Sequence, residues 1–507
     1  MAPLRPLGRR VVAAAARAVG PATPRAAALA VGVVVAAACA VHARTVTFDF
    51  VDLDDRDLVV DDLRFLASPA AFAGAFTRSY MHALDPSHPY YRPLVTLSFA
   101  LDARRAGAHA GGFHLTNLAL HLVASALFFA LLGRFSLGRA VTCAAAAAFA
   151  VHPAVASAVA WIPGRNDSLL AVLSLAAWLA FAHDCDRPSW RARSLHVASF
   201  WLALLAKETA LVIPLVCAAH LVLTRGPTRP RGVVVAGWVA GVAARLSVHA
   251  HPPVDAGSAL RGAALLPVSL GQVLLPFNPC LLGDRADVSP WPGLALAVLV
   301  AVAARAVPGV RPRVLGLGAA AFVLFVAPAA AAPGTLVLGS RLYLPACGAL
   351  LVAAEIARAA VRERHARVAV SVASVAVLAA LTVAYETTFR DRRAFARAAV
   401  AASPHAALAH VCLAKTLQLD GDRDRALSEY RLALALGASY VVHNNIAVIH
   451  MAEGRWADAE RELYAELGVD PGSARAYRNL AIVLRREDRP AEARAAEARA
   501  AELGAAP

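Results

Sequence analysis

Six aspartates lie within eleven residues near the start of the chain, in the stretch FVDLDDRDLVVDD at 50–62. An ionised carboxylate in such a loop could take a proton from an acceptor hydroxyl and act as a general base. Paired carboxylates could instead bind a divalent cation, because hard cations prefer oxygen ligands. The loop could also be merely solvated and help to orient the apolar segment before it. Charge alone leaves these three interpretations open.

Three further stretches gather polar residues at the edges of apolar runs: PYYRPLVTLSFALDARRAG at 89–107, GGFHLTNLALHLVASALFF at 111–129 and HPAVASAVAWIPGRNDSLL at 152–170. In the second stretch, His114, Asn117 and His121 share one face of the expected helix. Taken singly, each stretch is typical of the aromatic and arginine residues found at a membrane interface. We expect all three on the same side of the membrane as the aspartates, and together they indicate a functional site.

The elements that must position these residues are membrane helices. The chain has 507 residues, 59% of them hydrophobic, and a mean hydropathy of +0.56. Apolar runs of about 16–22 residues recur along the first three quarters, close to the ~20 residues that span a bilayer. The net charge of +15 comes mainly from arginines between apolar runs, which is typical of membrane topology, so nucleic-acid binding is not expected. The seven cysteines have neither metal-ligand spacing nor a disulfide framework.

Arginine placement predicts about eleven spans, because every second loop is then arginine-rich. The alternation holds only if the apolar piece at 262–282 is re-entrant or interfacial. We expect a cytoplasmic segment at 1–25, with a signal peptide cleaved near Ala43 as the alternative, and an acidic extracytoplasmic loop at 43–112. The predicted spans lie at about 26–41, 113–133, 139–152, 168–183, 194–206, 209–224, 232–250, 292–307, 314–332, 341–357 and 366–385. Together they form a predicted transmembrane domain at 26–388.

The composition changes at about residue 389, where charged residues rise and the apolar runs stop. Leu-Ala or Ile-Ala pairs recur with a period of about 33–34 residues, the tetratricopeptide value. They begin at Leu413, Ile446 and Leu480, and a second alanine follows each pair by twelve residues. Residues 389–507 are therefore predicted to form a solenoid of about three tetratricopeptide repeats outside the cytoplasm.

Several motifs together resemble a known family. They are the acidic pair Asp54-Asp55, YYRPL at 90–94, GFHLTNLALHL at 112–122, HP…VAWIPGRNDSL at 152–169, LLAKETALVIPL at 204–215 and SRLYLP at 340–345. The chain resembles the bacterial and eukaryotic membrane proteins with C-terminal tetratricopeptide repeats in the GT-C glycosyltransferase superfamily. The animal members are O-mannosyltransferases of the endoplasmic reticulum. Two features depart from the family pattern: relatives often carry more repeats, and the aromatic residue before the acidic pair is replaced by Leu53.

The resemblance implies an inverting transfer of a sugar, mannose by analogy, from a polyprenyl-phosphate donor to a hydroxyl on an exported protein. Asp54 or Asp55 would be the base. Arginines suit the leaving phosphate because a guanidinium offers planar, paired donors, and the implied phosphate ligands are Arg92, Arg165, Lys207 and Arg341. The implied lining residues are Tyr91, His114, Asn117, His152, Trp161, Asp167, Glu208 and Tyr343. No cofactor is implied, and a divalent metal is possible without being required.

The expected partners are the lipid-linked donor, membrane lipid and an acceptor protein held by the repeats, in a bacterial inner or plasma membrane. Two other functions stay open from the sequence. One is a non-catalytic membrane scaffold whose repeats recruit exported proteins. The other is a ligase or polymerase of lipid-linked glycans, which also combines many spans with repeats.

The arginine pattern predicts that the acidic loop and the repeats share the extracytoplasmic side. Reporter domains fused after Asp62 and after Glu386 should both be exported, whereas one fused after Arg187, in an arginine-rich loop, should stay in the cytoplasm. Activity of a periplasm-dependent reporter measures this directly. Opposite locations for the first two fusions would show that 262–282 crosses the membrane.

Overall fold

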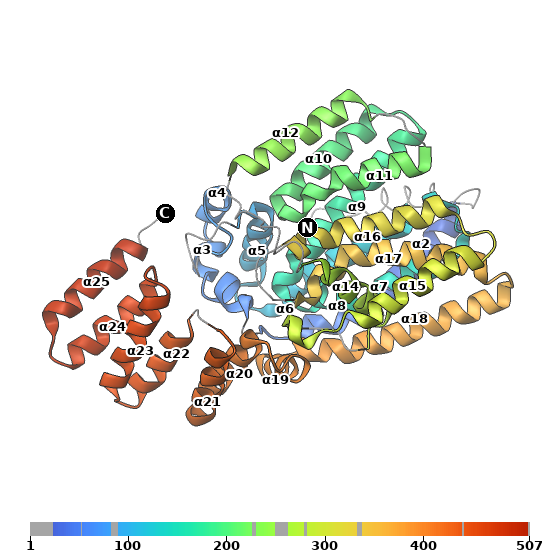
Figure 1. Ribbon diagram of the computed structural model, residues 1–507. Coiled ribbons are helices and arrows are strands. Elements are labelled where there is room, and N and C mark those ends of the chain that lie inside the picture. Colours follow the sequence, from blue (N-terminus) through green and yellow to red (C-terminus); the bar gives the residue numbers. More distant parts are fainter. Residues whose placement is uncertain are drawn as a thin grey trace.

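The computed structural model describes residues 24–51, 53–82, 90–225, 230–248, 262–277, 281–331, 337–438 and 441–504. The predicted cytoplasmic segment therefore lies almost wholly outside the described residues, as does Asp52. Strands among the described residues are limited to β1 (Leu282–Gly283) and β2 (Val337–Leu338), which pair antiparallel. The chain is an all-α, multi-pass membrane protein, as predicted. A large helical bundle adjoins a smaller array of C-terminal helices at one end (Figure 1).

Every predicted span contains a helix. The helices of the bundle are α2 (Pro24–His42), α6 (Ala110–Leu132), α7 (Arg139–Ala150), α8 (Pro153–Ala160), α9 (Arg165–Asp186), α10 (Trp190–Ala206), α11 (Ile213–Arg225), α12 (Gly232–Val248), α15 (Trp291–Ala306), α16 (Pro312–Ala331), α17 (Tyr343–Ala360) and α18 (Arg364–Glu386). Within the described residues, seven helical segments are long and apolar enough to cross a membrane, or eight if the bent pair α7–α8 is one span. The helices α10, α12 and α15 have 17, 17 and 16 residues and are shorter than this criterion requires.

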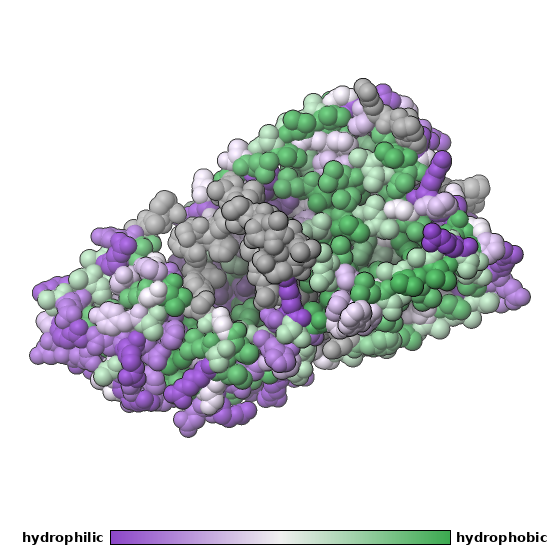
Figure 2. Space-filling model, viewed as in Figure 1, coloured by the Kyte–Doolittle hydropathy of each residue, from purple (hydrophilic) through white to green (hydrophobic). Residues whose placement is uncertain are grey.

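Apolar side chains cover the outside of the bundle. On α15 and α18, Val298 is 64% exposed and Val372 is 63% exposed, and hydrophobic residues dominate the bundle surface in Figure 2. Hydrophilic residues gather instead on the C-terminal helices. This division is what a lipid-embedded bundle with a water-exposed array requires.

The bundle bends at His152-Pro153, where α7 and α8 meet at 47°. Proline lacks the N–H that would continue the hydrogen-bond ladder of α7. The His152 ring accepts a hydrogen bond from the N–H of Ala154 at 3.1 Å and so caps α8. Histidine and proline therefore start a new helix that leads back toward the acidic loop.

The piece at 262–282 contains one short helix, α14 (Leu265–Leu274), among its described residues. Ten residues of α-helix extend about 15 Å, roughly half the hydrocarbon thickness of a bilayer. The helix packs against α15 and α16. Its length agrees with the predicted re-entrant or interfacial segment.

The arginine-rich loops meet at one end of the bundle. Asp184 pairs with Arg193 and Arg231 at 3.2 and 3.4 Å. The neighbouring Asp186 pairs with Arg134 and Arg225. Loops that the arginine pattern places on one side of the membrane thus lie side by side.

The acidic loop lies at the other end of the bundle. It contains the short π-helix η2 (Arg56–Val60) and the helices α3 (Leu63–Ala67), α4 (Ala70–Thr77) and α5 (Pro93–Ala106). Phe48 and Val51 pack with Trp161 and with Tyr385 and Phe389 at the end of the last span. This apolar contact fixes the start of the loop against the bundle.

The C-terminal array begins with α19 (Arg392–Ala402) and continues as three consecutive helix pairs, α20–α21 (Ala407–Leu419, Arg423–Ala435), α22–α23 (Val442–Ala452, Trp456–Val469) and α24–α25 (Ala474–Arg486, Pro490–Gly504). The alanines of the predicted repeat are all buried: Ala414, Ala426, Ala447, Ala459, Ala481 and Ala493. The turns inside the pairs hold Gly421, Gly454 and Asp488 at positive φ of 87°, 74° and 59°. Aspartate therefore takes a glycine conformation in the third pair. The pairs agree with the predicted period, and their assignment to the tetratricopeptide class stays a prediction.

Candidate functional site

The aspartates of the acidic loop have different partners. The Asp55 side chain is 1% exposed and accepts the N–H of Val51 at 2.9 Å, so it fixes the turn before η2. Asp61 and Asp62 lie near Arg56 and His82, at 3.4 and 3.3 Å. These contacts favour Asp54 over Asp55 as the reactive carboxylate of the predicted pair.

Asp57 and Asp54 face the C-terminal helices. Asp57 lies 4.0 Å from Arg475 of α24, and Lys415 of α20 acts electrostatically on both aspartates. The aspartates of the acidic loop are thus opposite in charge to basic residues of the array and of the loop itself. These electrostatic contacts account for the concentration of negative charge in the loop.

Asp54 is partly buried, and its proton affinity is unusual. Burial, and then the neighbouring charge of Asp57, raise the pKa of the Asp54 carboxyl to about 6, while Arg92 and Lys415 act in the opposite direction. A carboxyl with this pKa is mostly ionised at neutral pH, yet holds a proton more readily than an ordinary aspartate. Those are properties of a general base.

Two motifs from distant parts of the sequence meet at Arg92, which acts electrostatically on Asp54. Arg92, just before α5, makes a bidentate pair with Glu208, with Nη2–Oε1 and Nε–Oε2 distances of 2.7 and 3.2 Å. Lys207 follows α10, and its Nζ lies 2.6 Å from Asp167 Oδ1 and 3.0 Å from Asn166 Oδ1. The rings of Tyr90 and Tyr80 lie 4.6 and 5.3 Å from the Arg92 guanidinium, and Arg92 acts electrostatically on Asp54.

Two more arginines join this group. Arg341 interacts electrostatically with Asp167, Glu208 and Arg92. Arg245 of α12 is 4% exposed, and its Nη2 lies 3.9 Å from Glu208 Oε2 while its guanidinium lies 5.9 Å from the Tyr91 ring. Among the described residues, Arg245 Nε and Nη1 have no hydrogen-bond partner.

We call Arg92, Lys207, Arg245 and Arg341 the cationic cluster. Asp167 and Glu208 are the described carboxylates that pair with it, so its cations outnumber those partners by four to two. Burial of an uncompensated cation is costly, because the charge loses its hydration. The cluster is therefore suited to an anionic ligand, and the free N–H groups of Arg245 would point to the same chemistry.

Arg165 has a different environment from the other predicted phosphate ligands. It is fully buried, and its guanidinium contacts Asp102 Oδ2 at 2.6 Å, Asn117 Oδ1 at 2.8 Å and the Phe113 carbonyl oxygen at 2.7 Å. The ring of Phe99 lies 4.7 Å away. The structure therefore favours a supporting role for Arg165, holding α5, α6 and α9 together, over the predicted contact with a donor phosphate.

Five of the predicted lining residues also support the site from within the bundle. Asn117 donates to the carbonyl oxygens of Val159, Trp161 and Ile162 and so fixes the turn before α9. Tyr343 lies 2.6 Å from Nδ1 of His121, whose Nε2 lies 3.0 Å from the Ala150 carbonyl oxygen. All five are buried: His114, Asn117, His152, Trp161 and Tyr343. Tyr343 follows Arg341 by two residues and interacts electrostatically with Asp167, so it lies near the cationic cluster. Tyr91, Asp167 and Glu208 contact residues of the cluster, and their role in lining a donor site stays a prediction.

The sequence analysis missed Arg245, Tyr80, Asn166 and Lys415. The signal for Arg245 was present, because it is the one charged residue in GVVVAGWVAGVAARLSV, and a lone charge in an apolar helix indicates function. Asn166 stood inside a quoted motif, between Arg165 and Asp167. Lys415 could not be found, because its proximity to Asp54 depends on how the C-terminal array folds back.

Within the described ranges, no three His, Cys, Asp or Glu side chains are arranged to hold a metal ion. The possible dependence on a divalent metal stays untested.

Fold and site define a multi-pass membrane protein with a charged centre at one end of its helices. No protein-family model matches the chain. Protein O-mannosyl-transferase Tmtc1 of Drosophila melanogaster is 36% identical over 157 residues, which are 31% of this chain and 18% of that protein. Tmtc2 of the same species is 34% identical over 176 residues, covering 32% and 19%. Human protein O-mannosyl-transferase TMTC1 is 31% identical over 198 residues, covering 36% and 22%.

These matches confirm the resemblance to the O-mannosyltransferases that the motifs predicted. They extend over about a third of this chain, and over about a fifth of the length of each of these relatives.

The enclosed position of Arg165 leads to a stability prediction. Asp102→Ala should lower stability by about 3–5 kcal/mol, because it leaves Arg165 buried without its carboxylate. Asp61→Ala is the matched control: its side chain is 44% exposed and pairs at the surface, so the change should cost about 0–1 kcal/mol. Thermal unfolding of the detergent-purified protein measures both. If Asp102→Ala leaves the melting temperature unchanged and weakens donor binding, Arg165 contacts the donor phosphate and its supporting role is wrong.

Proposed function

We propose that this protein is a membrane glycosyltransferase that moves a sugar from a polyprenyl-phosphate donor to a hydroxyl group of an exported protein. The observation that supports the proposal most is the cationic cluster, which suits an anion and whose Arg92 acts electrostatically on Asp54, a carboxylate with a raised pKa. The relatives named protein O-mannosyl-transferases support mannose as the sugar and protein as the acceptor. The donor class and the stereochemistry go beyond those names.

In the proposed reaction, the cationic cluster holds the phosphate of the donor while its lipid tail stays in the bilayer. Asp54 accepts the proton of the acceptor hydroxyl as its oxygen forms a bond to the anomeric carbon. The bond from that carbon to the phosphate oxygen breaks, and the electron pair leaves on the phosphate, which the cations stabilise. The phosphate needs no proton to leave, so one carboxylate on the opposite face is enough and the configuration is inverted.

Each cation has a distinct part in this scheme. Arg92 and Lys207 are held by Glu208 and Asp167, so they are oriented before the donor arrives. Arg245 has N–H groups without described partners, and these are free to bind phosphate oxygens. Arg341, from the motif SRLYLP at 340–345, supplies a further positive charge.

A scaffold function has less support. A protein that only recruits partners through its repeats has no need to bury Arg92, Lys207 and Arg245 around two carboxylates at the end of its helices, since the desolvation cost is high. A ligase or polymerase of lipid-linked glycans would use the same donor site, and it differs only in its acceptor. The proposed setting is a bacterial inner or plasma membrane, with the site and the repeats on the extracytoplasmic side.

The assignment of the base is tested by four single variants. Asp54→Asn should lower the transfer rate by about 10²–10⁴-fold, because an amide cannot accept the proton. Asp55→Asn keeps the oxygen that accepts the Val51 N–H, so it should retain most activity, and Asp61→Asn and Asp62→Asn should cost little. Transfer from polyprenyl-phosphate mannose to peptides of exported proteins measures the rate. Full activity in Asp54→Asn would remove it from the reaction.

The pH dependence of transfer follows from the environment of Asp54. Because the base must be ionised, the rate should fall as pH drops through about 6. Asp57→Asn removes the negative charge that raises the pKa of Asp54, so the acidic limb should move to lower pH. Lys415→Met removes an opposing positive charge and should move it to higher pH. The pH–rate profile of each variant is the measurement, and shifts in the wrong direction would contradict the assignment.

A further inference from the structure

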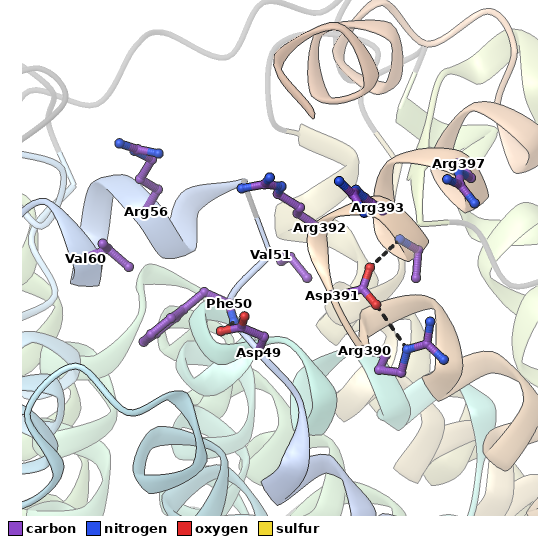
Figure 3. A pocket seen from close by; sticks show the side chains of 11 residues that line it. Asp49, Phe50, Val51, Arg56, Val60, Arg390, Asp391, Arg392, Arg393 and Arg397 are labelled. Carbon is purple, nitrogen blue, oxygen red and sulfur yellow. Dashed lines mark hydrogen bonds and ion pairs between the residues drawn. The ribbon is translucent and has the colours of Figure 1, made fainter. Parts of the chain in front are cut away.

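A groove of about 810 Å³ lies between the acidic loop and α19. Figure 3 shows Arg56 on one side of it and Arg392, Arg393 and Arg397 on the other, with Phe50, Val51 and Val60 toward the loop. The lining thus combines apolar side chains with five arginines and two aspartates. The groove is separate from the cationic cluster, with which it shares no residue.

The arginines of α19 are held in position by the rest of the array. Asp391 accepts the N–H of Ala394 at 2.8 Å and pairs with Arg390 at 3.0 Å. Asp420, directly after α20, pairs with both Arg392 and Arg393, at 3.0 and 2.7 Å. The other face of α19 packs into the apolar cluster under the acidic loop, through Phe395, Ala396 and Ala399. The arginine face is therefore fixed toward the groove.

These arginines retain capacity for a ligand. A guanidinium carries five N–H donors. Arg56 contacts Asp61 through Nε alone, and Arg392 contacts Asp420 through Nη2 alone. Arg397 is exposed and makes no hydrogen bond or ion pair within the described part of the chain. Carboxylates are the natural partners for such donors.

The position of the groove indicates which kind of anionic molecule binds there. Val51 and Arg56 lie on either side of Asp54 in the sequence, so one wall is the loop that carries the proposed base. The other wall is α19, which leads into the C-terminal array. A polypeptide lying in the groove would pass beside Asp54, where the proposed function requires its hydroxyl.

We propose that this groove binds an extended, acidic segment of the acceptor polypeptide, with apolar side chains against Phe50, Val51 and Val60 and carboxylates on the arginines. The inference rests on the proposed function for its choice of partner. It makes acidic sequence around the modified hydroxyl a determinant of substrate choice.

The test is direct binding of a fluorescent serine- and threonine-containing peptide rich in Asp and Glu to the full chain in nanodiscs of neutral lipid. Arg397→Glu should raise its Kd about 5- to 10-fold, because an attractive contact becomes a repulsive one. Arg423→Glu, an exposed arginine outside the groove, should leave the Kd unchanged. A peptide with Asn and Gln in place of Asp and Glu should bind more weakly, and added salt should reduce the difference.

Three results would overturn the proposal: equal binding by Arg397→Glu and Arg423→Glu, equal affinity for acidic and neutral peptides, or a response to Arg397→Glu only when anionic lipid is added. A response that needs anionic lipid would show that the groove binds a lipid headgroup.

Because binding needs no turnover, Asp54→Asn should bind the peptide normally. If the peptide binds in an arginine-dependent way but no sugar is transferred, the result contradicts the proposed function and leaves the groove proposal standing. If sugar is transferred at the same rate to acidic and neutral peptides, the result contradicts the groove proposal and leaves the proposed function standing.

Discussion

A charge buried among apolar helices must be compensated within the protein, and this constraint organises the whole bundle. Glu386 at the end of the last span is fully buried, and its partners are His42 at 2.5 Å and Arg44 at 3.4 Å. Arg165 is enclosed by Asp102 and Asn117, and Glu355 is held by two arginines at the opposite end. These groups join helices that are distant in the sequence. The cationic cluster departs from the pattern, since its cations exceed their described carboxylate partners, and that excess favours binding of an anion.

The acidic loop connects the bundle to the C-terminal array. Asp54 lies under the influence of Arg92, which belongs to the bundle, and of Lys415, which belongs to the array. Its proton affinity therefore depends on both parts being in place. Asp57 and Arg475 add a second electrostatic contact between them. The array thus contributes to the electrostatic environment of the acidic loop.

The sequence predicted much of this, because hydropathy and arginine placement report directly on membrane helices. The helices, the end of the predicted span at residue 152 and the helix pairs of the array all follow local rules of spacing and proline chemistry. Arg92, Lys207, Glu208 and Arg341 were found through motif resemblance. What could not be predicted is the direction of each side chain: Arg165 and Asp167 are two residues apart, yet one is enclosed by Asp102 while the other pairs with Lys207. Arg245 and Lys415 reach the site only through tertiary packing, which no local pattern encodes.

The central claim is that the cationic cluster binds the phosphate of a lipid-linked sugar beside Asp54. A cryo-electron microscopy structure of the chain in nanodiscs with a non-hydrolysable polyprenyl-phosphate mannose analogue tests it most directly. The account predicts the phosphate within hydrogen-bond distance of Arg245 and of at least one of Arg92 and Arg341, with the anomeric carbon facing Asp54. A phosphate bound elsewhere, with Arg245 still enclosed and unoccupied, would contradict it.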